Sequence, residues 1–223
     1  MRTISIAIDG PAGAGKSTIA KIVAKRININ YLDTGAMYRA VALKALEMGL
    51  DCKDPEQIIP MLSSTNLSVS YERERQLVYV DGKDVTDLIR SPQVSIAASD
   101  IAVIPEVRMK LVEIQRELAQ RYSLVVDGRD IGTYVLPNAD KKFYLTATID
   151  ERARRRWLEL IDRGYTLDIN EIKKDLEKRD MNDMNRSFAP LRKAEDAILI
   201  DTTDKTIEEV VDEVCSHLSD IFA

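Results

Sequence analysis

A glycine-rich segment near the N-terminus carries the most specific chemistry in the sequence. Residues 10–17 fit the phosphate-binding pattern G-x-x-x-x-G-K-[ST] and follow a short apolar run. Glycines let successive backbone N–H groups turn inward around a phosphate, and the helix that follows adds its positive end. The lysine can reach the outer phosphates, and the serine hydroxyl can complete a Mg²⁺ shell. We therefore predict a nucleoside triphosphate site at Gly10, Pro11, Ala12, Gly13, Ala14, Gly15, Lys16, Ser17 and Thr18, with Ser17 on the metal.

A phosphate-binding loop alone leaves the reaction open, because GTPases, ATPase motors, regulators and small-molecule kinases share it. A GTPase is expected to carry a guanine-reading Asn-Lys-x-Asp tetrapeptide, which this sequence lacks. Residues 138–141 hold Asn, Asp and Lys, but in another order. The other charged motifs must therefore indicate what the triphosphate reacts with.

Two charged segments that follow predicted strands favour a second anionic ligand. Residues 33–39 read Asp-Thr-Gly-Ala-Met-Tyr-Arg, a turn that opens a helix, and Arg39 can grip a phosphate with its planar guanidinium. Residues 127–130 read Asp-Gly-Arg-Asp at the carboxyl end of a strand, where a doubly wound sheet forms its ligand crevice. The alternatives are an ordinary capped helix with a solvated arginine and a chance charged loop.

Arginines gather on two predicted helices in the C-terminal half. The first helix ends near Gly164 and carries the cluster Arg152, Arg154, Arg155, Arg156 and Arg163. Such a cluster indicates either dense salt bridging or a lid that closes over a triphosphate, and the phosphate-binding loop favours the lid. The second helix begins at a predicted capping box, Asp168 and Glu171. If it continues through residue 186, one face holds Arg179, Asp183 and Arg186.

The elements that must position these side chains alternate along the chain. Apolar runs predict strands at residues 4–8, 31–32, 124–127, 142–147 and 197–201, each followed by a helical pattern. This alternation is typical of a parallel sheet covered on both faces. Residues 63–92 break the rhythm, because they alternate with period two and carry an Asp-Gly hairpin turn at 81–82. We predict one domain, residues 1–223, with a small antiparallel insertion.

Composition excludes several classes of protein. The 223 residues are 45% hydrophobic and 31% charged, which is typical of a globular chain and not of a disordered one. A net charge of −5 argues against a general nucleic-acid binder. No run is long enough for a membrane span or a secretory signal, so we expect a cytoplasmic protein. Cys52 and Cys215 match no metal or disulfide pattern, and His217 is expected to be a bystander.

Taken together, these motifs resemble those of bacterial cytidylate kinases, which are nucleoside monophosphate kinases. The resemblance runs from about residue 4 through the C-terminal helix, and it rests on residues 8–17, 32–39, 127–132, 179–180 and 183–186. It implies a P-loop NTPase-type α/β fold with about five parallel strands flanked by helices. It also implies that the insertion enlarges the monophosphate-binding region and that a helical lid covers about residues 152–180.

The resemblance implies roles for individual residues as well. The acceptor phosphate would be surrounded by Thr34, Arg39, Arg129, Arg179 and Arg186. Asp183 would take the sugar hydroxyls, and the cytosine edge would be read by Ser99, Arg108 and Asp130. The adenine of ATP is expected near residues 201–203. The charge on the transferred group would be stabilised by Lys16, Arg129 and Arg186. Within the arginine cluster, spacing selects Arg152 and Arg156 as the lid candidates for the same role.

The reaction implied is transfer of the γ-phosphoryl group of ATP to CMP or dCMP, with Mg²⁺, to give ADP and CDP or dCDP. A kinase for UMP, AMP or a non-nucleotide acceptor is one alternative, and a P-loop regulator that binds ATP without transfer is another. We expect no nucleic-acid or membrane partner and a monomeric enzyme.

Overall fold

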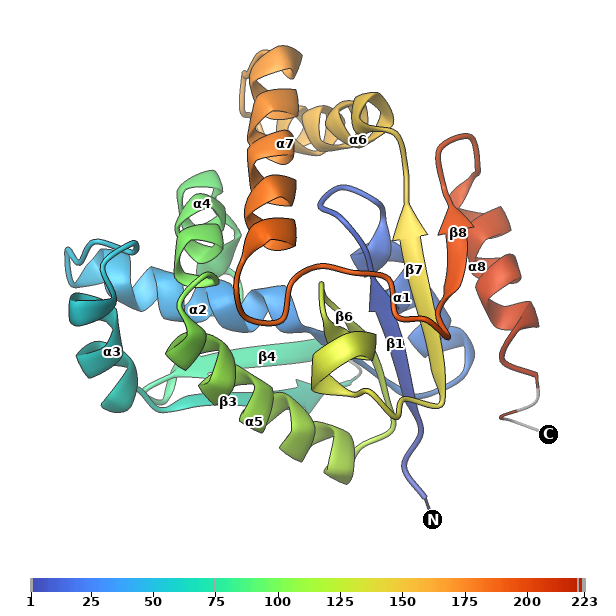
Figure 1. Ribbon diagram of the computed structural model, residues 1–223, viewed down its shortest axis with the longest axis horizontal. Coiled ribbons are helices and arrows are strands. Elements are labelled where there is room, and N and C mark those ends of the chain that lie inside the picture. Colours follow the sequence, from blue (N-terminus) through green and yellow to red (C-terminus); the bar gives the residue numbers. More distant parts are fainter. Residues whose placement is uncertain (1, 74, 220, 222–223) are drawn as a thin grey trace.

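A five-stranded parallel sheet forms the centre of the protein in a computed structural model, which describes residues 2–73, 75–219 and 221. Its strands are β1 (Ser5–Asp9), β2 (Asn30–Asp33), β6 (Leu124–Asp127), β7 (Lys141–Thr146) and β8 (Ile198–Asp201). They lie in the order β2-β6-β1-β7-β8, and every neighbouring pair is parallel (Figure 1). The strands predicted from apolar runs, and the parallel α/β class, are thus confirmed.

Alternating side chains of the central strands fill two separate cores. Ile6 and Ile8 of β1 face one core, which also holds apolar residues of α1 (Lys16–Arg26) and α8 (Ile207–Ser216). Ala7, between them, faces a larger core. That core is built with α2 (Thr34–Glu47), α3 (Pro55–Ser63), α4 (Pro92–Ile101) and α5 (Pro105–Arg121). Because both faces are covered, the strands are apolar almost throughout.

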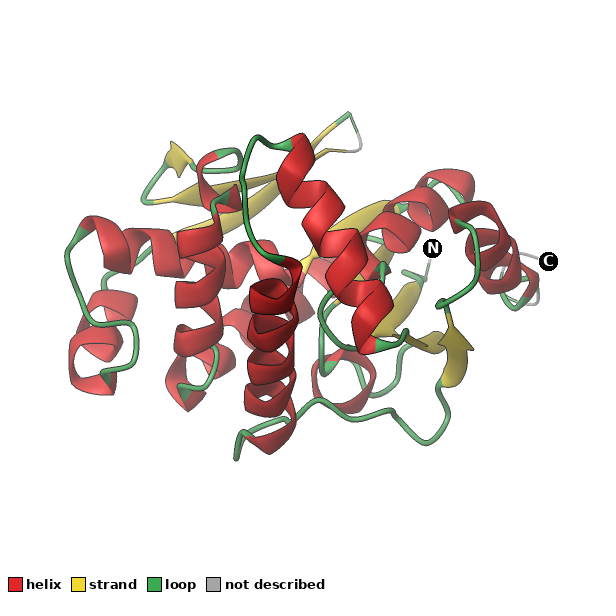
Figure 2. Cartoon of the chain, turned by 90° about the horizontal axis from the view of Figure 1, so that it is seen from above, coloured by secondary structure: helices red, strands yellow, loops and turns green. Residues whose placement is uncertain are grey.

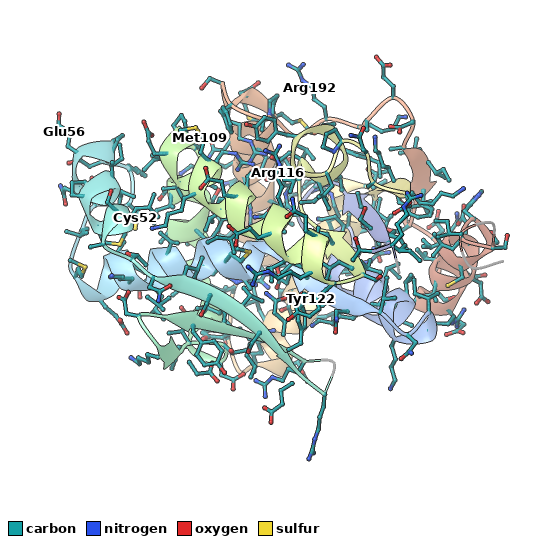
Figure 3. All side chains as sticks on the ribbon, turned by 90° about the horizontal axis from the view of Figure 1, so that it is seen from below. Cys52, Glu56, Met109, Arg116, Tyr122 and Arg192 are labelled. Atoms are coloured by element: carbon teal, nitrogen blue, oxygen red, sulfur yellow. The ribbon has the colours of Figure 1, made fainter. Side chains whose placement is uncertain are left out.

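The predicted insertion is a three-stranded antiparallel sheet that lies to one side of the main sheet (Figure 2). Its strands are β3 (Leu67–Glu72), β4 (Arg75–Val80) and β5 (Lys83–Asp84), and a 3₁₀ turn, η1 (Leu88–Arg90), follows. Asp81 and Gly82 both have positive φ, 51° and 81°, as the tight turn between β4 and β5 requires. Tyr71 of β3 meets Tyr122 edge-on at the end of α5, with ring centroids 5.4 Å apart; Tyr122 is labelled in Figure 3.

A short π-helix, η2 (Ile131–Val135), follows β6 and was not expected from the sequence. Arg116 on α5, labelled in Figure 3, donates through Nε and Nη2 to the carbonyls of Val135 and Tyr134 at 3.0 and 2.8 Å. This side chain satisfies carbonyls that the irregular turn leaves open. These hydrogen bonds therefore fix the position of η2 between β6 and β7.

Two helices lie above the carboxyl end of the main sheet in Figure 1: α6 (Ile149–Asp162) and α7 (Ile169–Asn185). The second helix ends at Asn185, one residue short of the length considered from the sequence, and Arg186 follows it in an extended conformation with ψ 141°. Asp168 caps α7, but the predicted capping box with Glu171 is not formed. The Asp168 carboxylate accepts from the N–H of Asn170 and not from that of Glu171.

The two cysteines and the histidine lie outside the lining of the cleft described below. Cys52 and Cys215 are free thiols, buried and half-buried, and His217 ends α8 with its ring 6.3 Å from that of Phe143. Among the residues that the structure describes, no helix combines the length and the apolar character needed to cross a membrane.

Candidate active site

A cleft of about 920 Å³ opens at the carboxyl end of the main sheet, below α6 and α7. It brings together nearly all the residues selected from the sequence, although they come from helices and loops spread along the whole chain. Its lining includes residues 12–18 together with Thr34, Arg39, Ser99, Arg108, Arg129, Asp130, Arg156, Arg179, Asp183 and Arg186. Gly10, Pro11 and Arg152 lie outside the lining.

The glycine-rich loop between β1 and α1 has the backbone that only glycine provides easily. Gly10 has φ 144°, and a Cβ there would lie 1.9 Å from the carbonyl oxygen of Leu145 in the neighbouring strand. Lys16 is buried, and its Nζ donates to the carbonyl of Pro11 at 2.7 Å. Burial, together with the nearby positive charges of Arg129 and Arg179, lowers the pKa of Lys16 to about 7. A negatively charged ligand beside Lys16 would therefore stabilise the ammonium form of its side chain.

The carboxylate of Asp127 accepts hydrogen bonds from two hydroxyl groups beside this loop. The Ser17 hydroxyl donates to Asp127 Oδ2 at 2.8 Å, and the Tyr31 hydroxyl donates to Oδ1 at 2.8 Å. Burial and the nearby charge of Asp33 raise the pKa of Asp127, although the charge of Lys16 acts in the opposite direction. A hydroxyl and a carboxylate are the ligands that Mg²⁺ takes from protein, with phosphate and water completing its shell. The residues present therefore fit a nucleotide-bound Mg²⁺.

The turn after β2 prepares Arg39. Asp33 caps α2 by accepting from the N–H of Ala36 at 3.0 Å, and its second oxygen accepts from Arg39 Nη2 at 2.7 Å. Thr34 donates through Oγ1 to the carbonyl of Asp127 at 2.8 Å, which joins this turn to the end of β6. Both segments that the sequence singled out after strands thus meet at one edge of the cleft.

Arg179 on α7 faces the cleft without an ion pair to any acidic side chain of the described residues. Burial and the neighbouring Arg129 lower its pKa to about 10. Arg129 itself donates through Nε to Asp183 Oδ2 at 2.8 Å. Lys16, Arg129 and Arg179 therefore repel one another around the same space. An anion of several charges placed there would relieve that repulsion.

Asp183 lies between two arginines, Arg129 and Arg186, with Arg186 Nη1 3.6 Å from Oδ1. Burial alone would raise the pKa of Asp183, but Arg129, Arg179 and Arg186 hold it below its usual value. The expected common face of Arg179, Asp183 and Arg186 is thus present. Arg186 reaches it from just beyond the end of α7.

A buried ion pair forms the far wall of the cleft. Arg108 Nη2 donates to Asp130 Oδ2 at 2.6 Å, and Arg186 Nη2 lies 3.2 Å from Oδ1. Arg108 Nε and Arg186 Nη2 are buried without a hydrogen bond. Buried donors of this kind carry a free-energy cost unless a ligand satisfies them. Ser99 lines the same wall from α4.

The arginine cluster of α6 divides into two groups. Arg154, Arg155, Arg156 and Arg163 line the cleft and form ion pairs with Glu151 or Glu159 on the same helix. Arg155 also donates to Thr202, to Oγ1 at 2.9 Å and to the carbonyl at 2.5 Å, in the loop where the adenine was expected. Arg152 points elsewhere: its guanidinium bonds Asp180 and the carbonyls of Ala12 and Ala147.

Sequence reasoning missed Asp9, the last residue of β1. Its carboxylate is buried and accepts from the N–H groups of Ile131 at 2.8 Å and Gly132 at 2.7 Å. Burial raises its pKa to about 7. The signal was a carboxylate directly after an apolar strand, where a partner is required. Through these two hydrogen bonds Asp9 holds the first turn of η2, which begins at the residue after Asp130.

Comparison with known proteins decides the family. The model of the cytidylate kinase family matches residues 6–220. The chain belongs to the cytidylate kinase family. A cytidylate kinase from Caldicellulosiruptor bescii is 54% identical over 214 residues, which cover 96% of this chain and 95% of that protein. One from Desulfitobacterium hafniense is 52% identical over 219 residues, covering 98% and 94%.

Solved structures of other proteins share the fold of this chain. An uncharacterised protein from Eubacterium ventriosum superposes with a TM-score of 0.53 at 14% identity, covering 97% of this chain and 98% of its own. A gluconokinase from Sinorhizobium meliloti gives a TM-score of 0.50 at 14% identity, covering 99% and 95%. At such low identity the likeness concerns the fold alone.

Proposed function

We propose that the protein transfers the γ-phosphoryl group of ATP to CMP or dCMP, giving ADP and CDP or dCDP. One observation carries the proposal beyond family membership: the phosphate-binding loop and the buried Arg108–Asp130 pair line the same cleft. A triphosphate on the loop and a pyrimidine against that pair would direct their phosphates towards each other. Transfer would then occur between Lys16 and Arg179.

In this proposal the donor occupies the end of the cleft next to α1. The N–H groups of residues 13–18 and the Lys16 ammonium bind the phosphates, and Gly10, Pro11 and Ala12 shape the loop. The adenine lies against the loop after β8, where Thr202, Ile207 and Val210 line the cleft. Ser17 and Asp127 would hold Mg²⁺, which neutralises charge on the phosphate oxygens when it is bound.

The acceptor occupies the other end of the cleft. Its phosphate is surrounded by Thr34, Arg39, Arg129, Arg179 and Arg186. The planar guanidinium groups suit a phosphate because each can donate two parallel hydrogen bonds. Asp183 accepts from a ribose hydroxyl, which also leaves Arg129 and Arg186 free to turn to the phosphate.

The cytosine ring lies against Ser99, Arg108 and Asp130. Asp130 accepts from the N4 amino group of cytosine, and Arg108 donates to N3. Uracil offers the reverse, an acceptor at O4 and a donor at N3. This difference favours CMP over UMP.

The lid of about residues 152–180 closes over the phosphates. Arg156 is its best candidate for contact, because it lines the cleft and its positive charge acts on the guanidinium of Arg179. Phosphoryl transfer depends more on positioning and neutralisation of charge than on a general base. Arg152 contributes differently, as argued below. In this proposal the enzyme acts in the cytoplasm as a monomer, and it has no nucleic-acid or membrane partner.

A coupled assay of ADP formation, with ATP and Mg²⁺ and a panel of CMP, dCMP, UMP and AMP, tests the function. We expect ADP release that depends on CMP or dCMP. A regulator that only binds ATP would release no ADP in response to any acceptor. A kinase of broader specificity would use UMP or AMP as efficiently as CMP.

A further inference from the structure

Ala12, at the tip of the phosphate-binding loop, is held by the two lid helices through all three of its groups. Its N–H donates to Asp180 Oδ1 on α7 at 3.3 Å, and its carbonyl accepts from Arg152 Nη1 on α6 at 2.9 Å. Its methyl group belongs to a small apolar core with Ala153, Leu160, Ile172 and Leu176 of the same helices. The tip of the loop is therefore packed into this small core of α6 and α7, which we call the lid base.

Arg152 and Asp180 make this attachment rigid. Both residues are buried, with side chains 9% and 11% exposed, and Arg152 Nη1 lies 2.6 Å from Asp180 Oδ2. Arg152 Nε also donates to the carbonyl of Ala147 at 3.1 Å, at the end of the strand that leads into α6. A Cβ on the neighbouring Gly13 would lie 3.0 Å from Arg152 Cβ, so α6 approaches the loop closely.

Asp180 occupies a particular place in the sequence of α7. The residue before it, Arg179, and the residue three positions later, Asp183, both line the acceptor end of the cleft. The same helix thus carries two residues that line the acceptor end of the cleft, and it holds the donor loop through Asp180. Asp180 therefore connects the donor loop to the helix that carries Arg179 and Asp183.

From these contacts we infer that Asp180 is a positioning residue for phosphoryl transfer, and that Arg152 assists it. Asp180 fixes the tip of the donor loop relative to Arg179 and Asp183, so that the γ-phosphoryl group faces the acceptor phosphate. The inference rests on the proposed function, since it concerns the alignment of the same two nucleotides. It assigns neither Asp180 nor Arg152 a contact with substrate.

Turnover at saturation of both nucleotides tests the inference. In Asp180→Asn the Ala12 N–H keeps an acceptor, but the ion pair with Arg152 is lost; in Asp180→Ala both interactions are lost. We expect kcat to fall at least about tenfold, and further in the alanine variant, because a displacement of about 1 Å can slow a reaction about a hundredfold. The Kd for CMP should stay within about twofold of wild type, since Arg179 and Asp183 remain. Asp175→Asn, an exposed residue of the same helix, is the matched control.

A second variant separates positioning from stability. Removing one partner of a buried ion pair can unfold a protein, whereas replacing both with apolar residues is often tolerated. Arg152→Met/Asp180→Leu therefore keeps the lid base filled while it releases Ala12. We expect a melting temperature close to that of wild type and a kcat still at least about tenfold lower. Wild-type kcat in this variant, or in folded Asp180→Ala, would overturn the inference.

The wild-type enzyme separates this inference from the proposed function. If wild type released no ADP in response to CMP, the proposed function would fail. If wild type were active and the variants equalled it, only the role of Asp180 would fail.

Discussion

The side-chain amide of Gln76 makes two hydrogen bonds to the backbone of Asp33. Gln76 Oε1 accepts from the Asp33 N–H at 2.7 Å, and Nε2 donates to the Asp33 carbonyl at 3.2 Å. Gln76 lies on β4 of the insertion, while Asp33 ends β2 of the main sheet. The insertion is therefore attached at the residue whose carboxylate holds Arg39. This contact explains how an insertion outside the main sheet can influence the acceptor site.

Replacement of Gln76 should impair the acceptor more than the donor. Each neutral hydrogen bond contributes about 0.5 to 1.5 kcal/mol. We therefore expect Gln76→Ala to raise the KM for CMP about three- to tenfold, with the KM for ATP almost unchanged. Steady-state kinetics with one nucleotide varied at a time checks this, with the exposed Gln93→Ala as the control. An equal rise in both KM values would contradict the assignment.

Lys16 should act mainly on the chemical step. Negative charge moves towards the bridging oxygen during transfer, and a preorganised cation gains most where charge develops. We expect Lys16→Ala to lower kcat about 10²- to 10³-fold, comparable to the loss of one oxyanion donor. Circular dichroism should show an intact fold. Lys25→Ala, an exposed lysine of the same helix, should keep wild-type turnover, and wild-type turnover in Lys16→Ala would remove the loop from the mechanism.

The sequence predicted features that depend on local pattern. Apolar runs located all five strands of the main sheet, and the Asp-Gly pair at 81–82 located a hairpin. The destination of a long side chain was not predictable, because it depends on residues far along the chain. Arg152 reaches Ala12, and Gln76 reaches Asp33, across 140 and 43 positions. α7 ends one residue before Arg186, and beyond it the N–H of Leu191 donates to the carbonyl of Asp183 at 2.8 Å.

The low pKa of Lys16, about 7, predicts proton uptake when ATP binds. At pH 8 a group with a pKa of about 7 is roughly 90% deprotonated, so the free enzyme holds mainly the neutral amine. Triphosphate beside the amine favours the ammonium form and raises its pKa. Calorimetry in buffers of different ionisation enthalpy should therefore give uptake of nearly one proton at pH 8 and little at pH 6. Uptake by Lys16→Met equal to that of wild type would assign the proton to another group.

Asp183 should distinguish ribose from deoxyribose. If its carboxylate accepts from the 2′-hydroxyl, Asp183→Ala removes a hydrogen bond to a charged group, which contributes about 1.5 to 3 kcal/mol. We expect binding of CMP to weaken about ten- to hundredfold more than binding of dCMP. Both acceptors should lose some affinity, since Asp183 also orients Arg129. Titration of each acceptor into Asp183→Ala and the control Asp175→Ala measures the difference, and equal losses for CMP and dCMP would exclude the 2′-hydroxyl as the partner.

The choice of base should depend on Asp130, whose carboxylate lies between Arg108 at 2.6 Å and Arg186 at 3.2 Å. A carboxylate at this place can accept from the N4 amino group of cytosine and faces like polarity at O4 of uracil. Attraction for one base and repulsion of the other act together, and mismatched buried hydrogen-bonding groups discriminate strongly. We expect kcat/KM for CMP to exceed that for UMP at least about a hundredfold. Asp130→Asn should narrow this ratio, because the amide can present either a donor or an acceptor to the ring. Parallel kinetics with CMP and UMP on both proteins check this, and comparable wild-type efficiencies would indicate a kinase for pyrimidine monophosphates in general.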